Sequence, residues 1–268
     1  MSLTAVPDDD EFCMDGIWMP GRQVRVQHSS ARPPAAVAWI TDGASSSAGS
    51  VWVSLGERAA ATGLQPLLLS GLGGGTARPW DEGEFSEPED PGGISGIDVA
   101  RLLQERWDSQ VPLADEYEGD EELRTMFAPF GLRFPGLAPA VEEGPDPQLM
   151  RRALYQYTRS GRIGLVPASR PADILPCLGW EGACSHLTSL EVAAVLRSWE
   201  DRFGARVLQV GFADIRLLVS RPPQTLEAAQ RIAAEHFAFC DEACMGLRDV
   251  SEIAPALVNN PFWDFWWD

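Results

Sequence analysis

The C-terminal part of the chain has the clearest pattern of apolar and polar positions. Thr188 and Glu191 form a T-x-x-E capping box ahead of apolar residues at helical spacing, and Gly204 is placed to end that helix. In order, the pattern predicts a strand, a helix, two strands of a hairpin and a second helix, at residues 162–166, 188–204, 206–210, 215–220 and 225–240. This order is typical of an antiparallel strand pair covered by helices, which is an α+β arrangement.

The N-terminal half is patterned less regularly. Its predicted elements are a short strand, one or two helical turns and a buried strand, at residues 50–55 (SVWVSL), 57–62 and 65–70 (QPLLLS). Residues 97–107 have the spacing of an amphipathic helix, with Asp98 near its start. The strand–helix–strand order favours an α/β lobe.

Long stretches of the same half are rich in proline, glycine and acidic residues. Residues 78–96 predict a surface loop with few core side chains, residues 115–147 show no periodicity, and residues 1–15 predict a loose lead-in. We place a domain boundary before a predicted connecting helix at 149–159. The expected layout is an acidic, loop-rich lobe at 1–148 and a compact C-terminal domain at 149–268.

The chain ends in an aromatic tail, NNPFWDFWWD. Its five aromatic residues are Phe262, Trp263, Phe265, Trp266 and Trp267. Each can bury roughly 150–250 Å². We therefore interpret the tail as a final strand or clasp on the C-terminal domain, near Trp180 or Trp199. The alternative is an interaction site, because a large exposed apolar patch marks a binding surface.

The charge of the chain narrows the choice of partners. The 268 residues carry a net charge of −18, and residues 1–150 alone hold 25 acidic and 9 basic side chains. Such a surface repels phosphate backbones and anionic lipids, so we expect no nucleic acid and no membrane partner, but it suits a basic protein. Because the sequence has neither a signal-peptide pattern nor a long apolar run, we expect a cytoplasmic protein.

Lysine is absent, and all 21 basic residues are arginine. Schiff-base enzymes, P-loop NTPases and protein kinases are thereby excluded, because each needs a lysine in its site. The glycine-rich segment 70–76 lacks the spacing of a nucleotide-binding loop, and Ser95 in GGISGI misses the nucleophile-elbow pattern. The acidic clusters match no EF-hand. We assign no catalytic residue.

Cysteine and histidine form two groups along the sequence. They are Cys177, Cys184 and His186, followed by His236, Cys240 and Cys244. Together they could supply zinc ligands, but no C-x-x-C pair is present, and buried free cysteines are the simpler interpretation. We predict no metal and no cofactor, and keep a metal-stapled domain as an alternative.

Four segments of the C-terminal part carry a family resemblance, and they are VLRSWEDRFGARV (195–207), VSRPPQTLEAA (219–229), AAEHFAFC (233–240) and FWWD (265–268). On these segments, residues 162–268 resemble the bacterial DUF4253 family, whose function is unassigned. RPWDEGE (78–84) is similar to the N-terminal extension of related actinobacterial proteins. The match departs after Cys240, where similar proteins often have proline and this chain has Asp241. The resemblance implies the two-part layout and a bacterial source, and it brings no catalytic residues.

Our leading functional hypothesis is a non-enzymatic protein-binding module, of an immunity or regulator type, whose acidic surface meets a basic partner. The runner-up is an enzyme or small-ligand binder with a pocket between the two lobes. The candidate ligand-binding residues for that pocket are Arg170, Trp180, His186, Glu235 and His236.

Overall fold

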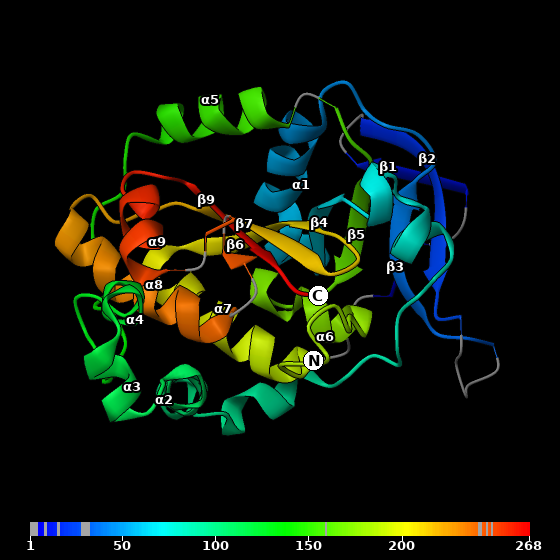
Figure 1. Cartoon of the computed structure of the whole chain (residues 1–268). Coiled ribbons are helices and arrows are strands. Elements are labelled where there is room, and N and C mark those ends of the chain that lie inside the picture. Colours follow the sequence, from blue (N-terminus) through cyan, green and yellow to red (C-terminus); the bar gives the residue numbers. More distant parts are fainter. Residues whose placement is uncertain are drawn as a thin grey trace.

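The computed structural model of the chain describes residues 5–7, 10–14, 17–27, 33–158, 160–240, 243–244, 246–247 and 249–268 (Figure 1). Within these residues, helices cover both faces of one mixed sheet of nine strands. The strands are β1 (Asp10–Met14), β2 (Ile17–Arg25), β3 (Ala36–Thr41), β4 (Leu64–Leu69), β5 (Ile163–Pro167), β6 (Ala205–Val210), β7 (Asp214–Val219), β8 (Ala243–Cys244) and β9 (Phe262–Trp266). Their order across the sheet is β1-β2-β3-β5-β4-β6-β7-β9-β8.

The helices lie in two layers. They are α1 (Ala48–Thr62), α2 (Val99–Gln110), α3 (Ala114–Gly119), α4 (Glu121–Met126), α5 (Pro147–Tyr157), α6 (Ile174–Leu178), α7 (Ser189–Phe203), α8 (Leu226–Phe239) and α9 (Val250–Leu257), with short helical segments η1 (Leu72–Gly74), η2 (Ala77–Asp81), η3 (Pro91–Gly96) and η4 (Pro171–Asp173). Figure 1 shows α1 and α5 on one side of the sheet and α2, α6, α7 and α8 on the other. Among the described residues, every helix is too short or too polar to span a membrane.

Strand β5 joins the two halves of the chain. It lies between β3 and β4 and is antiparallel to both, while β4 pairs in parallel with β6. β3 and β4 precede the boundary predicted at 148/149, and β5 follows it. Strands from both sides of that boundary therefore contribute to one sheet.

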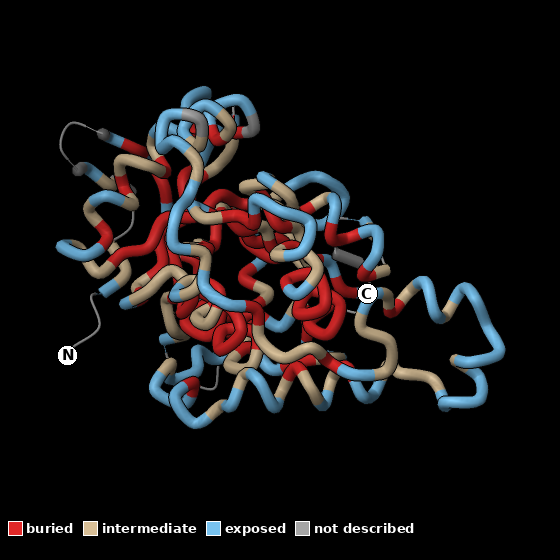
Figure 2. Tube along the Cα trace, turned by 90° about the vertical axis from the view of Figure 1, so that its left-hand side faces the viewer, coloured by how far each residue is buried: buried red, intermediate tan, exposed pale blue. Residues whose placement is uncertain are grey.

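Two apolar cores lie on opposite faces of this sheet. Leu68 of β4 belongs to the core beneath α1, whereas its neighbour Leu67 belongs to the core beneath α7 and α8. Successive side chains of a strand point to opposite faces, so each central strand supplies both cores. Figure 2 shows the buried residues gathered at the centre of the molecule and the exposed ones in peripheral helices and loops.

The C-terminal elements agree with the predicted α+β order. Thr188 and Glu191 close the capping box of α7, and Gly204 ends this helix at a φ of 63°. β6 and β7 form the antiparallel pair, and the side chain of Thr225 caps α8. The predicted helix at 97–107 is α2, with Asp98 as its cap. Here the signals are local, which is why the sequence pattern locates them.

Two predictions for the N-terminal half are wrong, and a third holds only in part. The strand predicted at 50–55 lies in the first half of α1, because the buried Trp52, Leu55 and Ala59 share one helical face, and Trp52 and Leu55 pack in the core on the sheet. The predicted lead-in contains β1, which pairs with β2, and the sequence pattern also missed β2 and β3. The predicted loop at 78–96 is mostly an exposed segment with the short helical segments η2 and η3 at its ends, but it also buries Trp80 and Phe85 in the core.

The aromatic tail forms strand β9, which pairs with β7. Trp263, Phe265 and Trp267 lie on the face toward α7, where Trp263 and Phe265 contact the ring of Trp199. Trp180 lies against Trp267, with their ring centroids 5.8 Å apart. The two neighbours predicted from the sequence are therefore both present, and the tail is a packed final strand. Phe262 is buried on the opposite face, and Trp266 is 45% exposed.

A buried carboxylate connects the helices beneath this aromatic layer. Glu235 of α8 has no solvent exposure and accepts two hydrogen bonds from the guanidinium of Arg202 in α7, at 2.7 and 2.6 Å. The indole of Trp199 donates to Glu235 at 2.8 Å, and the backbone N–H of Ala138 donates at 2.7 Å. A buried charge is tolerated when its partners satisfy it in this way.

Two tryptophans of β9 provide a matched test of the packed tail. Trp263→Ala should lower the free energy of unfolding by about 3–5 kcal/mol, because it leaves a large cavity between α7 and the sheet. Trp266→Ala removes a half-exposed ring from the same strand and should cost less than about 1 kcal/mol. Urea denaturation followed by circular dichroism measures both. Equal losses would contradict the packing described here.

The buried ion pair predicts a second effect on stability. Glu235→Gln keeps the side-chain shape but leaves the charge of Arg202 without its partner. Removing one member of a buried pair costs about 3–5 kcal/mol, and we expect the lower end, since Arg202 keeps 15% of its side-chain exposure. The same urea titration applies, with the exposed Glu142→Gln as the control. A loss no larger than that of the control would refute a stabilising role for the pair.

Candidate functional site

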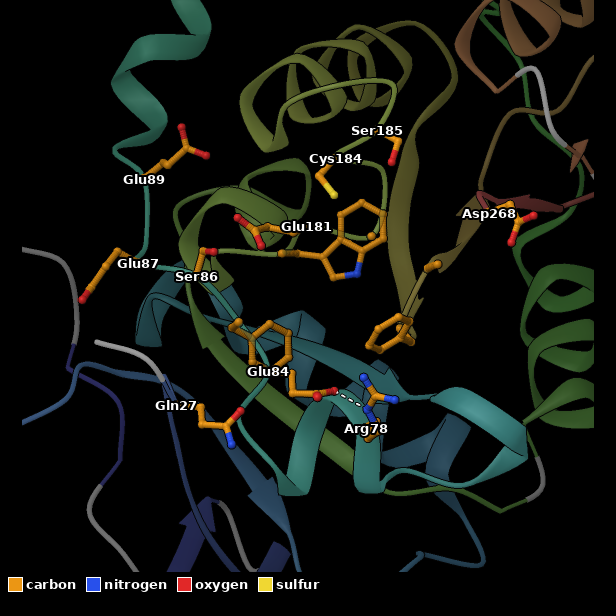
Figure 3. A pocket seen from close by; sticks show the side chains of 15 residues that line it. Gln27, Arg78, Glu84, Ser86, Glu87, Glu89, Glu181, Cys184, Ser185 and Asp268 are labelled. Atoms are coloured by element: carbon orange, nitrogen blue, oxygen red, sulfur yellow. Dashed lines mark hydrogen bonds and ion pairs between the residues drawn. The ribbon is translucent and has the colours of Figure 1, made fainter. Parts of the chain in front are cut away.

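A cleft of about 820 Å³ opens where two parts of the chain meet at one end of the sheet (Figure 3). One wall comes from residues 78–89, and the other comes from the loop after α6 and the turn between β6 and β7. The lining residues are Gln27, Arg78, Glu84, Phe85, Ser86, Glu87, Glu89, Trp180, Glu181, Gly182, Cys184, Ser185, Phe212, Ala213 and Asp268.

The close approach of the two walls depends on Gly179. This residue ends α6 at a φ of 67°, and its carbonyl accepts a hydrogen bond of 2.8 Å from the N–H of Ser86. A Cβ atom at position 179 would lie 2.0 Å from the carbonyl oxygen of Ser86. Glycine is required at position 179 for two reasons, because the backbone is left-handed and because a Cβ atom would clash with the carbonyl of Ser86. The N–H of Glu89 donates to the carbonyl of Pro176 at 2.9 Å and holds the far end of the wall.

Three hydrogen bonds fix the β6–β7 turn that carries Phe212. The N–H of Gly211 donates to Asp214 at 2.8 Å and closes the turn. The Trp180 indole donates to the carbonyl of Gly211 at 2.9 Å. The N–H of Trp267 donates to Ala213 at 2.9 Å, which ties the end of β9 to the same turn. The aromatic side of the cleft is therefore built on rigid backbone.

The segment RPWDEGE (78–84) forms the opposite side. The buried indole of Trp80 donates to the carbonyls of Ser70 and Val210, at 2.8 and 3.2 Å. Asp81 accepts two hydrogen bonds from Arg162, at 2.8 and 3.0 Å. These two residues anchor the segment to the sheet, and Arg78 and Glu84 remain at the cleft.

Arg78 and Glu84 form an ion pair within the cleft, as Figure 3 shows. The Nε of Arg78 lies 2.7 Å from a carboxylate oxygen of Glu84. The guanidinium carbon lies 4.8 Å from the ring centroid of Phe212, which is a cation–π contact. The hydrogen bond that Arg78 donates to Glu84 raises the pKa of Arg78, so the side chain stays charged.

Carboxylates dominate the rest of the lining. Carboxylate residues of the lining are Glu84, Glu87, Glu89, Glu181 and Asp268, and Arg78 is the one basic lining residue among those described. Glu89 also accepts a hydrogen bond from the hydroxyl of Ser189. Acidic side chains beside aromatic rings attract cations and repel anions. This arrangement fits a positively charged ligand group.

Comparison with known proteins assigns the segment that forms one side of this cleft to a family. Residues 162–268 match the family described as Domain of unknown function (DUF4253). This segment is a DUF4253 domain. No curated protein and no solved structure matches the chain. The DUF4253 domain supplies Trp180, Glu181, Phe212 and Asp268 to the cleft, and the preceding residues supply Arg78 with its partner Glu84.

The five ligand-binding candidates of the sequence analysis lie in different places. Within the DUF4253 domain, Trp180 lines the cleft with 2% of its surface exposed. Arg170 forms ion pairs with Glu200 and Asp201 at the ends of η4 and α7. His186 is partly buried, and its carbonyl accepts a hydrogen bond of 3.4 Å from Arg106.

Glu235 and His236 lie in the core of the DUF4253 domain and not at the cleft. The imidazole of His236 is enclosed by Trp199, Trp263 and Phe265, with ring centroids 4.8, 4.5 and 4.9 Å away. Burial, together with the charge of Arg202, lowers the pKa of His236 well below its ordinary value. The imidazole is therefore neutral, and the two residues stabilise the packing.

The cysteine and histidine groups do not come together into a metal site within the described residues, which hold no group of three His, Cys, Asp or Glu placed to bind a metal. Cys177 is a buried free cysteine, Cys240 is buried and donates a hydrogen bond to the carbonyl of Trp266, and Cys184 is exposed. The side chain of Cys244 lies outside the described residues. Burial, with the nearby charges of Asp173 and Asp90, raises the pKa of Cys177 to about 12.

Sequence reasoning missed most of the cleft. Phe212 sits in a turn whose residues carry no motif, and Glu181 has no characteristic neighbours. Arg78 and Glu84 did have a signal, since both belong to the RPWDEGE segment that resembles related proteins. The contact between that segment and the β6–β7 turn spans more than a hundred positions of sequence. No local pattern encodes it.

The two thiols at 177 and 184 should differ in reactivity. At pH 8 a thiol with a pKa of about 12 is roughly one ten-thousandth thiolate, and the thiolate is the reactive form, so native Cys177 should resist iodoacetamide. Exposed Cys184 should be alkylated readily, and Cys177 should react once urea unfolds the chain. Peptide mapping by mass spectrometry measures both rates. Native Cys177 reacting as fast as Cys184 would contradict its burial.

Proposed function

We propose that this chain is a non-enzymatic binding module that holds a basic protein partner in the acidic, aromatic cleft between residues 78–89 and the DUF4253 domain. The observation that carries the proposal is the lining of the cleft, in which five carboxylate side chains meet three aromatic rings and one arginine that is already paired. A lysine or arginine side chain is the protein group that complements such a lining.

The charge distribution outside the cleft supports the same partner. Residues 1–150 carry 25 acidic and 9 basic side chains, and the acidic residues of 115–122 are exposed on α3 and α4. A negative field of this kind raises the rate at which a basic protein finds the surface. It works against nucleic acids and anionic membranes, so the proposal includes neither as a partner.

The fate of the sequence-derived candidates also supports a binding role. Glu235 and His236 are buried in the core, and Arg170 forms ion pairs at the surface. Burial keeps the Cys177 thiol protonated. The thiols of Cys177 and Cys184 form no disulfide bond with a described residue, which suits a reducing compartment, and we propose a bacterial cytoplasmic setting of the immunity or regulator type.

A second candidate uses the same cleft. A volume of about 820 Å³ lies within the range of small-molecule sites, roughly 300–1,000 Å³, so a small cationic metabolite is the alternative occupant. Such a ligand would need only its cationic group and no peptide backbone to bind. Measuring the binding of free amines and guanidines beside that of peptides separates the two candidates.

The test measures binding of a fluorescein-labelled octapeptide with alternating glycine and basic residues, by fluorescence anisotropy. Peptides with glutamine or glutamate in place of the basic residues serve as ligand controls. We expect the basic peptide to bind, and raising the salt from 50 to 300 mM should weaken its affinity about tenfold, because screening shortens the reach of surface charges. Equal binding of all three peptides, or no salt effect, would refute the proposal.

A matched pair of variants locates the binding. Glu181→Gln removes one carboxylate from the cleft and should lower the affinity for the basic peptide about three- to tenfold. Glu142→Gln changes the net charge by the same amount at an exposed position outside the lining and should leave the affinity nearly unchanged. If the two variants change the affinity equally, the peptide is bound by the overall negative charge of the chain and not by the cleft.

A further inference from the structure

The cleft already contains a bound guanidinium, which is the chain's own Arg78. Its charge is met on one side by the Glu84 carboxylate at 2.7 Å and lies 4.8 Å from the ring centroid of Phe212. A carboxylate and an aromatic face around one planar cation are the two contacts by which proteins recognise arginine side chains. Arg78 thus shows which chemical group this part of the cleft accepts.

We propose that Glu84 and Phe212 form a guanidinium subsite, and that an arginine of the partner binds there by displacing Arg78. This inference rests on the proposed function and names the group that the cleft recognises. Glu84 comes from the segment before the DUF4253 domain and Phe212 from within it, so the subsite exists only where the two segments meet. The guanidinium of Arg78 leaves as the incoming one binds, and no covalent bond changes.

The exposure of the pair allows this exchange. The side chains of Arg78 and Glu84 keep 42% and 24% of their exposure, and exposed ion pairs contribute little to folding stability. Arg162 provides the contrast, because it is 11% exposed and is also bound by Thr76 and the Thr41 carbonyl. Arg162 is therefore fixed in place, whereas Arg78 can swing into solvent on an anchored backbone.

Two further carboxylates of the cleft lie outside the subsite. Glu181 and Asp268 line the same cleft and form no ion pair with any described residue. Figure 3 places both away from the Arg78–Glu84 pair, so they are available to other basic groups of the partner. Arginine offers five N–H donors in a planar fork and stacks on aromatic rings, and lysine offers a compact ammonium. The subsite should therefore prefer arginine to lysine.

Wild-type protein tests the preference directly. Three labelled octapeptides share one sequence and differ at one central position, which is arginine, lysine or citrulline. Citrulline has nearly the same shape as arginine without the charge. We expect the arginine peptide to bind about two- to fivefold more tightly than the lysine peptide, and the citrulline peptide to bind most weakly. Equal binding of the arginine and lysine peptides would overturn the subsite and leave the proposed basic partner intact.

Arg78→Gln tests the exchange. Removing the competing guanidinium of Arg78 should raise the affinity for the arginine peptide about threefold or more, beyond the effect of the lost positive charge. Arg101→Gln is the matched control, since it removes the same charge from an exposed helix position outside the cleft. If Arg78→Gln lowers the affinity for the arginine peptide, or raises it no more than the control does, Arg78 is a fixed part of the cleft wall. The exchange is then refuted.

Alkylation of Cys184 gives an independent readout, because this thiol lines the cleft. In the Arg78→Gln protein, low millimolar guanidinium chloride should occupy the vacated subsite and slow the reaction of Cys184 with iodoacetamide, whereas sodium chloride at equal ionic strength should not. Wild-type protein should show a smaller effect, since Arg78 occupies the subsite. Identical rates in both salts would refute a guanidinium subsite, whatever the peptides do.

Discussion

The carboxylate of Glu235 is the constraint on which the packing beneath the sheet depends. A charge without solvent exposure needs its partners in place, and Glu235 receives four hydrogen bonds from Arg202, Trp199 and the backbone of Ala138. These donors belong to α7 and to the irregular segment after α4, while Glu235 belongs to α8. One arrangement of the three segments satisfies the charge, and the aromatic layer of β9 packs against that arrangement.

The cleft is a consequence of this rigid core. Trp180 and Trp267 are held within the core and also bond to the backbone of the β6–β7 turn, so the turn presents Phe212 in one position. Ionisable groups of the DUF4253 domain thus divide into two sets. Glu235 and His236 are enclosed and serve the packing, whereas Glu181 and Asp268 are exposed at the cleft and remain available to a ligand.

The functional proposal depends on both segments of the chain. The DUF4253 domain provides the aromatic side of the cleft, and residues 78–89 provide Arg78, Glu84 and further carboxylates. The domain match therefore covers only part of the proposed site. The continuous sheet explains how the parts are held together, because β5 of the domain pairs with β3 and β4 of the preceding segment.

The sequence by itself determined the features that depend on neighbouring residues. The capping box at Thr188, the hairpin at β6 and β7, and the alternation of β9 all follow from short spacings. Tertiary structure decided the rest. It made residues 50–55 helical, enclosed Glu235 and His236, and brought Arg78 to Phe212. Pairing, desolvation and stacking between distant segments depend on where the chain returns in space, which local spacing does not encode.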